Sequence, residues 1–501
     1  MGVEFPVSAD GRRSTSALGR AVVADALRPV DPAGAKAAEQ ERDWRRRYLG
    51  HLRRLIEAGL PSADAALAVA RGGLESLHQR MRVVAADGAE APLASVETAT
   101  PAGPSPMTVT VTGDGESERA LTIPYRGERL SGDALARQLD DWIARGIMEP
   151  SCAEAVRAVA AHPEWLALPG RTVVVLGAGA EVGPLPVLLG WGAHVVGVDL
   201  ALPTVWARVL ETARRGAGTL EVPVARPPGA TAPPTEVGFD LVQDAGLDLA
   251  ADLPGVADWL AAIDGSLVLG NYVYADGAAN VRVASAVDAL TVRVLAARPD
   301  AALAFLATPT DVFAVPPEAV AESRQRFADR GLAAKLALTA SGGRLFREAY
   351  SPGPGAGSGS GSGQGPGVND SMIAQQGPNY VLAKRLQRWR ATVARHAGTT
   401  VSLNVAPPTK TRSVTKNRAL AAAYAGAPRF GVEAFDPTTT RVLMAALLVH
   451  DLCGDGGPAC AHPWQDEAHA AAPGGLWRIP YAPRTALPVA AVIGYPASRR
   501  S

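Results

Sequence analysis

The sequence predicts an α/β protein built on a doubly wound parallel sheet, with an α+β extension on its N-terminal side. Three observations lead to this fold class. From Arg171 onward, short apolar runs alternate with helix-like segments, which is the pattern of βαβ units. A glycine-rich turn containing Gly177, Gly179 and Gly183 follows the first apolar run. An acidic residue, Asp199, ends the second apolar run.

The composition is that of a globular chain without a charge bias. Of its 501 residues, 47% are hydrophobic, and 49 Lys and Arg balance 49 Asp and Glu. A neutral chain lacks the basic excess of general nucleic-acid or anionic-membrane binders. Its three cysteines are too few for a disulfide framework, and no apolar run approaches the ~18–20 residues of a membrane span. We therefore expect a cytoplasmic protein with a small-molecule partner, and neither nucleic acid nor membrane; homo-oligomerisation stays open.

The first third of the chain is expected to form two parts. Residues 1–34 are polar and punctuated by Gly and Pro, so they are predicted to be a mobile tail. Residues 35–165 are predicted to form the α+β region. Helical periodicity comes first, then a strand hairpin about residues 113–115, then an amphipathic helix that Ser131 would cap.

Residues 171–501 are predicted to form the main domain. One low-complexity stretch, "GPGAGSGSGSGQGPG" at 353–367, interrupts it. A segment of this composition cannot bury a core, so we expect a flexible loop there.

Residues 171–200 are predicted to form a strand, a glycine turn, a helix and a second strand, which is the context of a Rossmann-type nucleotide site. Glycines permit the tight turn and let backbone N–H groups approach a pyrophosphate, and a helix N-terminus adds a positive dipole end. Asp199 stands where a carboxylate would reach a ribose hydroxyl. Because that carboxylate would repel a 2′-phosphate, NAD is favoured over NADP. Methyltransferases that use S-adenosylmethionine also have such loops, but many carry an acid where this chain has Val175.

A second motif, "NYVLAK", contains Tyr380 and Lys384 four positions apart. Residues at i and i+4 share one face of a helix. An ammonium beside a phenol favours the phenolate and lowers the pKa of the phenol from about 10. Such a tyrosine can act as a general acid or base at a carbinol oxygen. So short a spacing also arises by chance, and its meaning depends on the surrounding order of elements.

From about residue 171 to 450, that order resembles a divergent short-chain dehydrogenase/reductase. "LGAGAEVG" at 176–183 resembles the cofactor loop of the family, and "FDLVQDAG" at 239–246 resembles its fourth strand. "AALAFLATPTDVFAVP" at 301–316 resembles the fifth strand. The Tyr-x-x-x-Lys pair follows, and "TTVSLNVAPPTKT" at 399–411 then resembles the sixth strand.

The resemblance implies roles for residues that the motifs alone do not assign. Lys384 would also hold the nicotinamide ribose. Glu181 replaces a glycine of the family's loop, and a carboxylate beside phosphates is repulsive unless the side chain turns away or caps the helix. The remaining implied roles are cofactor contacts by Asp244, Ala245, Gly246, Pro407 and Thr411, a proton-relay amide at Asn280, and a hydroxyl at Thr308 or Thr310 in place of the catalytic serine.

The expected function is NAD(P)-dependent oxidation or reduction of an alcohol/carbonyl pair, with Tyr380 and Lys384 as the acid/base pair. Two alternatives stay open: a methyltransferase that uses S-adenosylmethionine, and a catalytically inactive Rossmann-fold binding module. No metal is expected. His450, Cys453, Cys460 and His462 lie close in sequence, but their spacing is not that of a standard zinc site.

Overall fold

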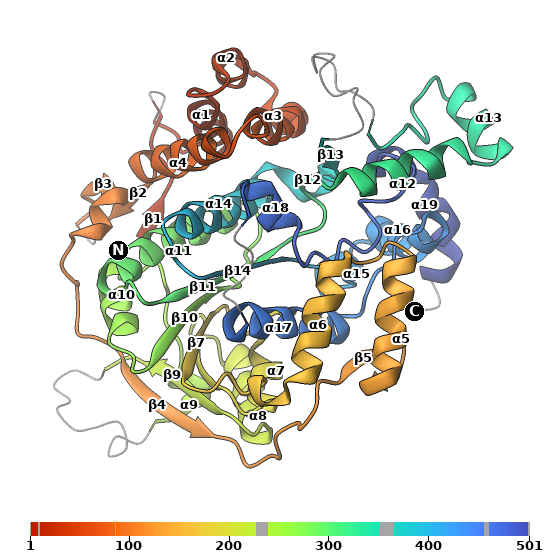
Figure 1. Cartoon of the computed structure of the whole chain (residues 1–501). Coiled ribbons are helices and arrows are strands. Elements are labelled where there is room, and N and C mark those ends of the chain that lie inside the picture. Colours follow the sequence, from red (N-terminus) through yellow and green to blue (C-terminus); the bar gives the residue numbers. More distant parts are fainter. Residues whose placement is uncertain are drawn as a thin grey trace.

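A mostly parallel sheet of seven strands organises the computed structural model, which describes residues 2–8, 11–85, 87–226, 239–350, 365–454 and 460–498 (Figure 1). Its strands are β4 (Met107–Thr112), β7 (Arg171–Leu176), β8 (His194–Val198), β9 (Thr219–Val224), β10 (Ser266–Asn271), β11 (Ala302–Ala307) and β14 (Val401–Val405). They lie in the order β14-β11-β10-β7-β8-β9-β4, and only β4 is antiparallel to its neighbour. The predicted α/β class is therefore confirmed.

The parallel strands are apolar because both faces of the sheet are buried. In β7, Val173 and Val175 point into one hydrophobic core, whereas Val174 and Leu176 point into the other. All four side chains are fully buried. Strands β7 and β8 lie where apolar runs in the sequence predict them, and β11 and β14 lie within 301–316 and 399–411, the stretches predicted as the fifth and sixth strands.

Helices cover each face of the sheet (Figure 1). One face carries α10 (Leu253–Ala261), α11 (Ala278–Ala297) and α14 (Gly377–His396). The other carries α7 (Leu185–Gly190), α8 (Pro203–Arg215), α17 (Pro437–Cys453) and, outside it, α6 (Pro150–Ala161). Within the described residues, no helix combines the length and apolarity that a membrane crossing requires.

The N-terminal residues form a further layer that packs on α14. Its helices are α1 (Thr15–Leu27), α2 (Pro32–Gln40), α3 (Trp44–Gly59) and α4 (Ala63–Arg80), and its small antiparallel sheet joins β1 (Gly2–Glu4), β2 (Arg82–Val84) and β3 (Glu90–Pro92). Although composition predicts a mobile tail over residues 1–34, α1 lies there and buries Leu18, Val22 and Leu27. The Trp389 ring of α14 lies so close to Gly73 of α4 that a side chain at that position would overlap it.

The predicted hairpin about residues 113–115 is wrong. Strand β4 precedes these glycines, but no strand directly follows them, and β4 pairs with the distant β9. A Cβ on Gly113 would lie 2.0 Å from the Gly216 carbonyl oxygen, so glycine serves a close backbone approach here. The hairpin lies further on, between β5 (Ile123–Tyr125) and β6 (Glu128–Leu130), before α5 (Gly132–Ala144).

The predicted fourth strand at 239–246 is also wrong. These residues include the short helix α9 (Leu241–Asp244), which begins where the Asp240 side chain accepts a hydrogen bond from the Val242 N–H. Along the chain, the next strand of the parallel sheet after β9 is β10, at "SLVLGN", and it pairs with β7. Because the strand lies at 266–271 and not at 239–246, Asp244, Ala245 and Gly246 do not lie at its carboxyl end.

The remaining α-helices and strands all follow β11 in the chain. They are β12 (Val312–Val315), α12 (Pro317–Ala328), α13 (Leu332–Ala340), β13 (Gly367–Asp370), α15 (Arg412–Lys416), α16 (Arg418–Gly426), α18 (Pro463–Ala468) and α19 (Pro483–Ser498). Most of the predicted Gly/Ser insert at 353–367 lies outside the described residues, and Gly367 begins β13.

Candidate functional site

The candidate site lies at the carboxyl ends of β7 and β10, where the order of the parallel strands reverses. Gly177 follows β7 with φ +90°, and a Cβ on it would lie 2.9 Å from the Tyr272 carbonyl oxygen just beyond β10. Glycine is therefore required by both backbone conformation and space. In open α/β sheets, ligands bind outside such a reversal point.

The glycine loop is held by the end of β8. The Gly177 and Ala178 N–H groups donate to the Val198 carbonyl oxygen at 2.8 and 3.0 Å. Asp199 accepts from the Gly179 N–H through Oδ2 at 2.8 Å and from the Leu200 N–H through Oδ1 at 2.8 Å. A carboxylate can accept about four hydrogen bonds, so Asp199 can hold the loop and still accept from a further hydroxyl.

Glu181 turns away from the loop that contains it. Its Oε2 accepts from the Arg412 N–H at 2.9 Å, at the first residue of α15. Its backbone oxygen accepts from Arg441 at 2.7 Å, and Arg208 donates to the Gly179 oxygen at 2.9 Å. The carboxylate therefore caps α15 instead of facing the loop, and guanidinium groups surround the loop.

The helix after the loop is shorter than the sequence predicts. Helix α7 begins at Leu185 and has six residues, and Gly183 lies in the turn before it, where its N–H donates to the Ala180 oxygen. A helix of so few residues contributes a weak dipole. Binding of an anion here would depend on individual N–H groups and on the nearby arginines.

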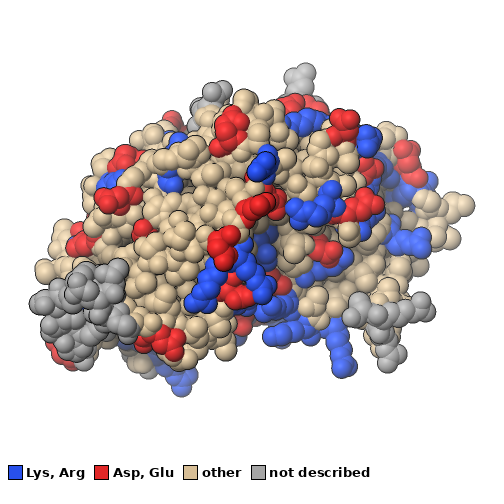
Figure 2. Space-filling view, turned by 90° about the horizontal axis from the view of Figure 1, so that it is seen from below, with Lys and Arg blue, Asp and Glu red and all other residues tan. Residues whose placement is uncertain are grey.

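Basic side chains do not form a uniform patch on the face seen from below. Lys and Arg gather near the middle of that face, with Asp and Glu among them (Figure 2). This mixture agrees with the absence of a net charge.

Tyr380 and both predicted threonines lie together. Thr308 and Thr310 follow β11, and their hydroxyl oxygens are 3.0 Å apart. The Thr308 side chain lies close enough to the Tyr380 phenol, which projects from the first turns of α14, to lower its pKa. The ring of Tyr274 meets that of Tyr380 edge-on, with centroids 6.2 Å apart.

The pKa of Tyr380 is raised, whereas the sequence predicts that it is lowered. Burial raises the pKa of this phenol, Thr308 lowers it and the charge of Asp311 raises it. Lys384 directs its Nζ to the Leu306 carbonyl oxygen at 3.2 Å and to Gln387 Oε1 at 3.0 Å. Burial alone lowers the pKa of Lys384 to about 8. The ammonium group of Lys384 is therefore bonded to Leu306 and Gln387, on the same helix face as Tyr380.

The amide linked to Lys384 is not Asn280. Asn280 is buried at the start of α11, where its Oδ1 accepts from the Ala275 N–H at 3.1 Å and holds the loop after β10. Gln387 joins Lys384 to Asn271 instead, donating to Asn271 Oδ1 at 3.1 Å. Gln387 lies three residues after Lys384, so the helical spacing could have indicated it.

Asp244, Ala245 and Gly246 lie beside the end of β8 rather than beside β10. Gly246 has φ +109° and approaches Ala201, and its N–H donates to the Pro223 oxygen at 2.8 Å. Ala245 forms a bridge with Val224, and the exposed Asp244 accepts from the Asp240 N–H. These residues shape the outer side of the loop that holds Asp199.

Pro407 and Thr411 lie in the segment that follows β14. The Pro407 oxygen accepts from the Thr409 hydroxyl at 2.8 Å, and Thr411 precedes α15 with its hydroxyl 3.0 Å from that of Ser413. Since Arg412 contacts Glu181, this segment lies against the glycine loop. The structure therefore brings Thr411 to the same end of the sheet as Gly177.

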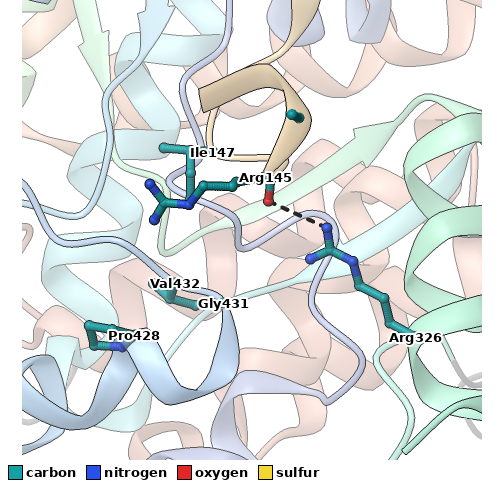
Figure 3. A pocket seen from close by; sticks show the side chains of 7 residues that line it. Arg145, Ile147, Arg326, Pro428, Gly431 and Val432 are labelled. Carbon is teal, nitrogen blue, oxygen red and sulfur yellow. Dashed lines mark hydrogen bonds between the residues drawn. The ribbon is translucent and has the colours of Figure 1, made fainter. Parts of the chain in front are cut away.

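Two cavities in the described chain contain no residue of the glycine loop in their walls. One, of about 340 Å³, contains Arg145, Ile147, Arg326 and Pro428 in its wall (Figure 3). Its arginines already have carboxylate partners: Arg145 pairs with Asp141 and Glu433, and Arg326 with Glu322. The other, of about 200 Å³, shares Arg145 and reaches Lys410 and Tyr424.

Trp477 lies in the hydrophobic core, and His462, from the Cys/His segment of the sequence, forms a hydrogen bond at the start of a helix. Trp477 is fully buried, and His462 accepts from the Trp464 N–H at the start of α18. Within the described ranges, no three His, Cys, Asp or Glu side chains gather as a metal site would need.

Comparison of the chain with family models, with curated proteins and with solved structures finds no match.

Proposed function

We propose that the protein is an NAD(P)-dependent oxidoreductase that acts on an alcohol/carbonyl pair. The observation that carries this proposal is the meeting of Tyr380 with Thr308 at the carboxyl edge of the sheet. A phenol and a hydroxyl that converge can act on one carbonyl oxygen: one transfers a proton and the other fixes the oxygen.

The strand order supports a Rossmann-type crevice for the cofactor. Numbered along the chain, the parallel strands from β9 to β14 lie in the order 3-2-1-4-5-6, the arrangement of dinucleotide-binding sheets. Gly177 keeps the crevice free of a side chain, and Asp199 has lone pairs left for a ribose hydroxyl. Within the described chain, no residue accepts from the Glu181 and Val182 N–H groups, which leaves donors for a phosphate.

The raised pKa of Tyr380 favours the protonated phenol. At neutral pH this phenol keeps its proton and can donate it to a carbonyl oxygen, as reduction requires. Thr308 would hold the same oxygen, and Lys384 would hold the ribose. The cofactor would supply the hydride, and the protein would orient it.

Thermal denaturation with NADH, NADPH and S-adenosylmethionine tests the proposal. We expect NADH to raise the melting temperature, because a ligand at 100 times its Kd stabilises the folded state by about 2.7 kcal/mol. NADPH should stabilise the protein less, since Asp199 would oppose a 2′-phosphate. Stabilisation by S-adenosylmethionine alone would contradict the proposal and favour a methyltransferase.

A second candidate function is that of a non-catalytic binding module. The observation that favours it is the engagement of Lys384 by Leu306 and Gln387, together with the raised pKa of Tyr380. Binding of NADH without turnover of any member of a panel of ketones and aldehydes would support this function over the enzyme.

A further inference from the structure

A series of hydrogen bonds leads from the turn before α14 to Thr308, beside the Tyr380 phenol. The Ile373 N–H donates to Gln376 Oε1 at 3.0 Å. Gln376 Nε2 donates to Thr310 Oγ1 at 2.8 Å, and Thr310 Oγ1 lies 3.0 Å from Thr308 Oγ1. The Thr308 side chain is in turn the nearest of this series to the Tyr380 phenol, and it lowers the pKa of that phenol.

The backbone determines the direction of this series. A backbone N–H can only donate, so the Gln376 atom that faces Ile373 is the amide oxygen. The atom that faces Thr310 is then the amide nitrogen, which can only donate. Thr310 therefore accepts from Gln376 and can give its own hydrogen to Thr308. Thr308 can then give its hydrogen to the phenol oxygen.

We propose that Gln376 is a positioning residue for Tyr380: by donating to Thr310, it aligns the two threonine hydroxyls so that Thr308 donates to the ionised phenol oxygen. A hydroxyl that accepts a hydrogen bond becomes a stronger donor, so alignment strengthens the last bond of the series. The catalytic meaning of this alignment rests on the proposed function. The alignment itself requires neither cofactor nor substrate.

Other groups around Tyr380 act on the same equilibrium. Asp311, in the loop after β11, opposes ionisation of the phenol by its charge. Tyr274, after β10, and Tyr424, on α16, lie within electrostatic reach, and Lys384 follows on the same helix. A test of Gln376 must therefore separate alignment from added charge.

Gln376→Glu makes that separation possible. It keeps an oxygen for the Ile373 N–H, so the turn before α14 retains its bond. It replaces the donor facing Thr310 with an acceptor, which reverses the Thr310 hydroxyl. A fluorinated tyrosine at position 380 of the full chain, followed by fluorine NMR against pH, reports the acid constant of this one ring. We expect that constant to fall about tenfold relative to the chain with Gln376.

Gln375→Glu is the matched control, because Gln375 is exposed beside Gln376. It adds the same charge without a bond to Thr310, and we expect the acid constant to change less than about twofold. Thr308→Val interrupts the series. In that background, the effect of Gln376→Glu should shrink to that of Gln375→Glu. Equal effects of the two glutamates, or an undiminished effect without Thr308, would overturn the proposal.

Gln376→Met provides a second test that adds no charge. Loss of the donor should lower the acid constant of Tyr380 about two- to fourfold, and an unchanged constant would also overturn the proposal. Since the titration uses neither cofactor nor substrate, it is independent of the NADH experiment. NADH binding with no effect of Gln376 rejects only the positioning role. An effect of Gln376 on the acid constant of Tyr380, without NADH binding, rejects only the proposed function.

Discussion

At the scale of single residues, Tyr380 is the group on which the proposed chemistry depends. Tyr380→Phe removes the proton donor and keeps the ring. We expect turnover with NADH and a ketone or aldehyde to fall about 100-fold or more, with NADH binding retained. Absorbance of the reduced cofactor measures turnover, and thermal denaturation measures binding.

Tyr274→Phe is the control for that variant. Tyr274 stacks edge-on against Tyr380, but its hydroxyl bonds to Asp276 at 2.7 Å. This variant should keep most of the turnover, because its hydroxyl is directed away from Thr308. Equal losses in the two variants would show that removing either hydroxyl disturbs the site, and that the Tyr380 proton has no special role.

Lys384 gives stability a dependence on pH with a definite sign. Burial lowers its pKa from 10.5 in the unfolded chain to about 8 in the folded protein. Between these values the unfolded chain binds more protons, so the contribution of Lys384 to the free energy of unfolding rises with pH. Below about pH 8 the buried charge costs roughly 3 kcal/mol, and this cost disappears by about pH 10.5.

Lys384→Met removes the titrating group and isolates this contribution. Urea unfolding of both proteins across that pH range should show the free energy of unfolding shifting in favour of the lysine protein as pH rises. Because the substitution also removes the bonds of Lys384 to Leu306 and Gln387, the free energies of unfolding of the two proteins also differ by an amount that can have either sign at every pH. A difference that stays flat with pH would contradict a lowered pKa.

At the scale of elements, the β7–turn–α7 unit depends on Gly177. Gly177→Ala would place a Cβ against the Tyr272 backbone and force φ +90° on an L-residue. We expect a loss of about 2 kcal/mol or more in the free energy of unfolding. Gly190→Ala, at the end of α7 with open space for a Cβ, should be neutral or slightly stabilising. Urea unfolding measures both variants, and similar losses would argue against the strained turn.

Elements also differ in how far the sequence predicts them. The strands at 173–176, 194–198, 302–307 and 401–405 are recognisable because burial on both faces demands continuous apolar runs. The antiparallel strand β4 is not, because its "MTVTVT" alternation fits a hairpin as well as an edge of the main sheet. The stretch 239–246 mimics a strand over too few apolar residues, and Asp240 starts a helix there.

At the scale of the whole molecule, the N-terminal layer and the sheet share one core. The hydrophobic cluster that contains Leu27 and Leu77 continues through Trp389 to Leu403 of β14. A buried ionic group joins the same parts: Asp288 of α11 binds His78 of α4 and Arg390 of α14. The helix that carries Tyr380 is therefore held from both sides.

This shared core predicts joint unfolding. Hydrogen exchange in increasing denaturant should show the amides of α4 and α14 converging on the same opening free energy. Exchange in α1–α4 with a clearly lower opening free energy than in α14 would show instead that the layer opens on its own. Mass spectrometry of peptides from each helix makes the comparison.

The sequence by itself determined the features that local rules control: the apolar parallel strands, the glycine turn ending at Gly183, Asp199 at a strand end, and a shared helix face for Tyr380 and Lys384. Only the tertiary structure decided the partners of polar groups. Glu181 caps α15, Lys384 binds Gln387, and Gln376 reaches Thr310. The reason is physical. The periodicity of apolar residues along the chain indicates which of them are buried. A hydrogen bond between distant segments depends instead on where folding brings both groups.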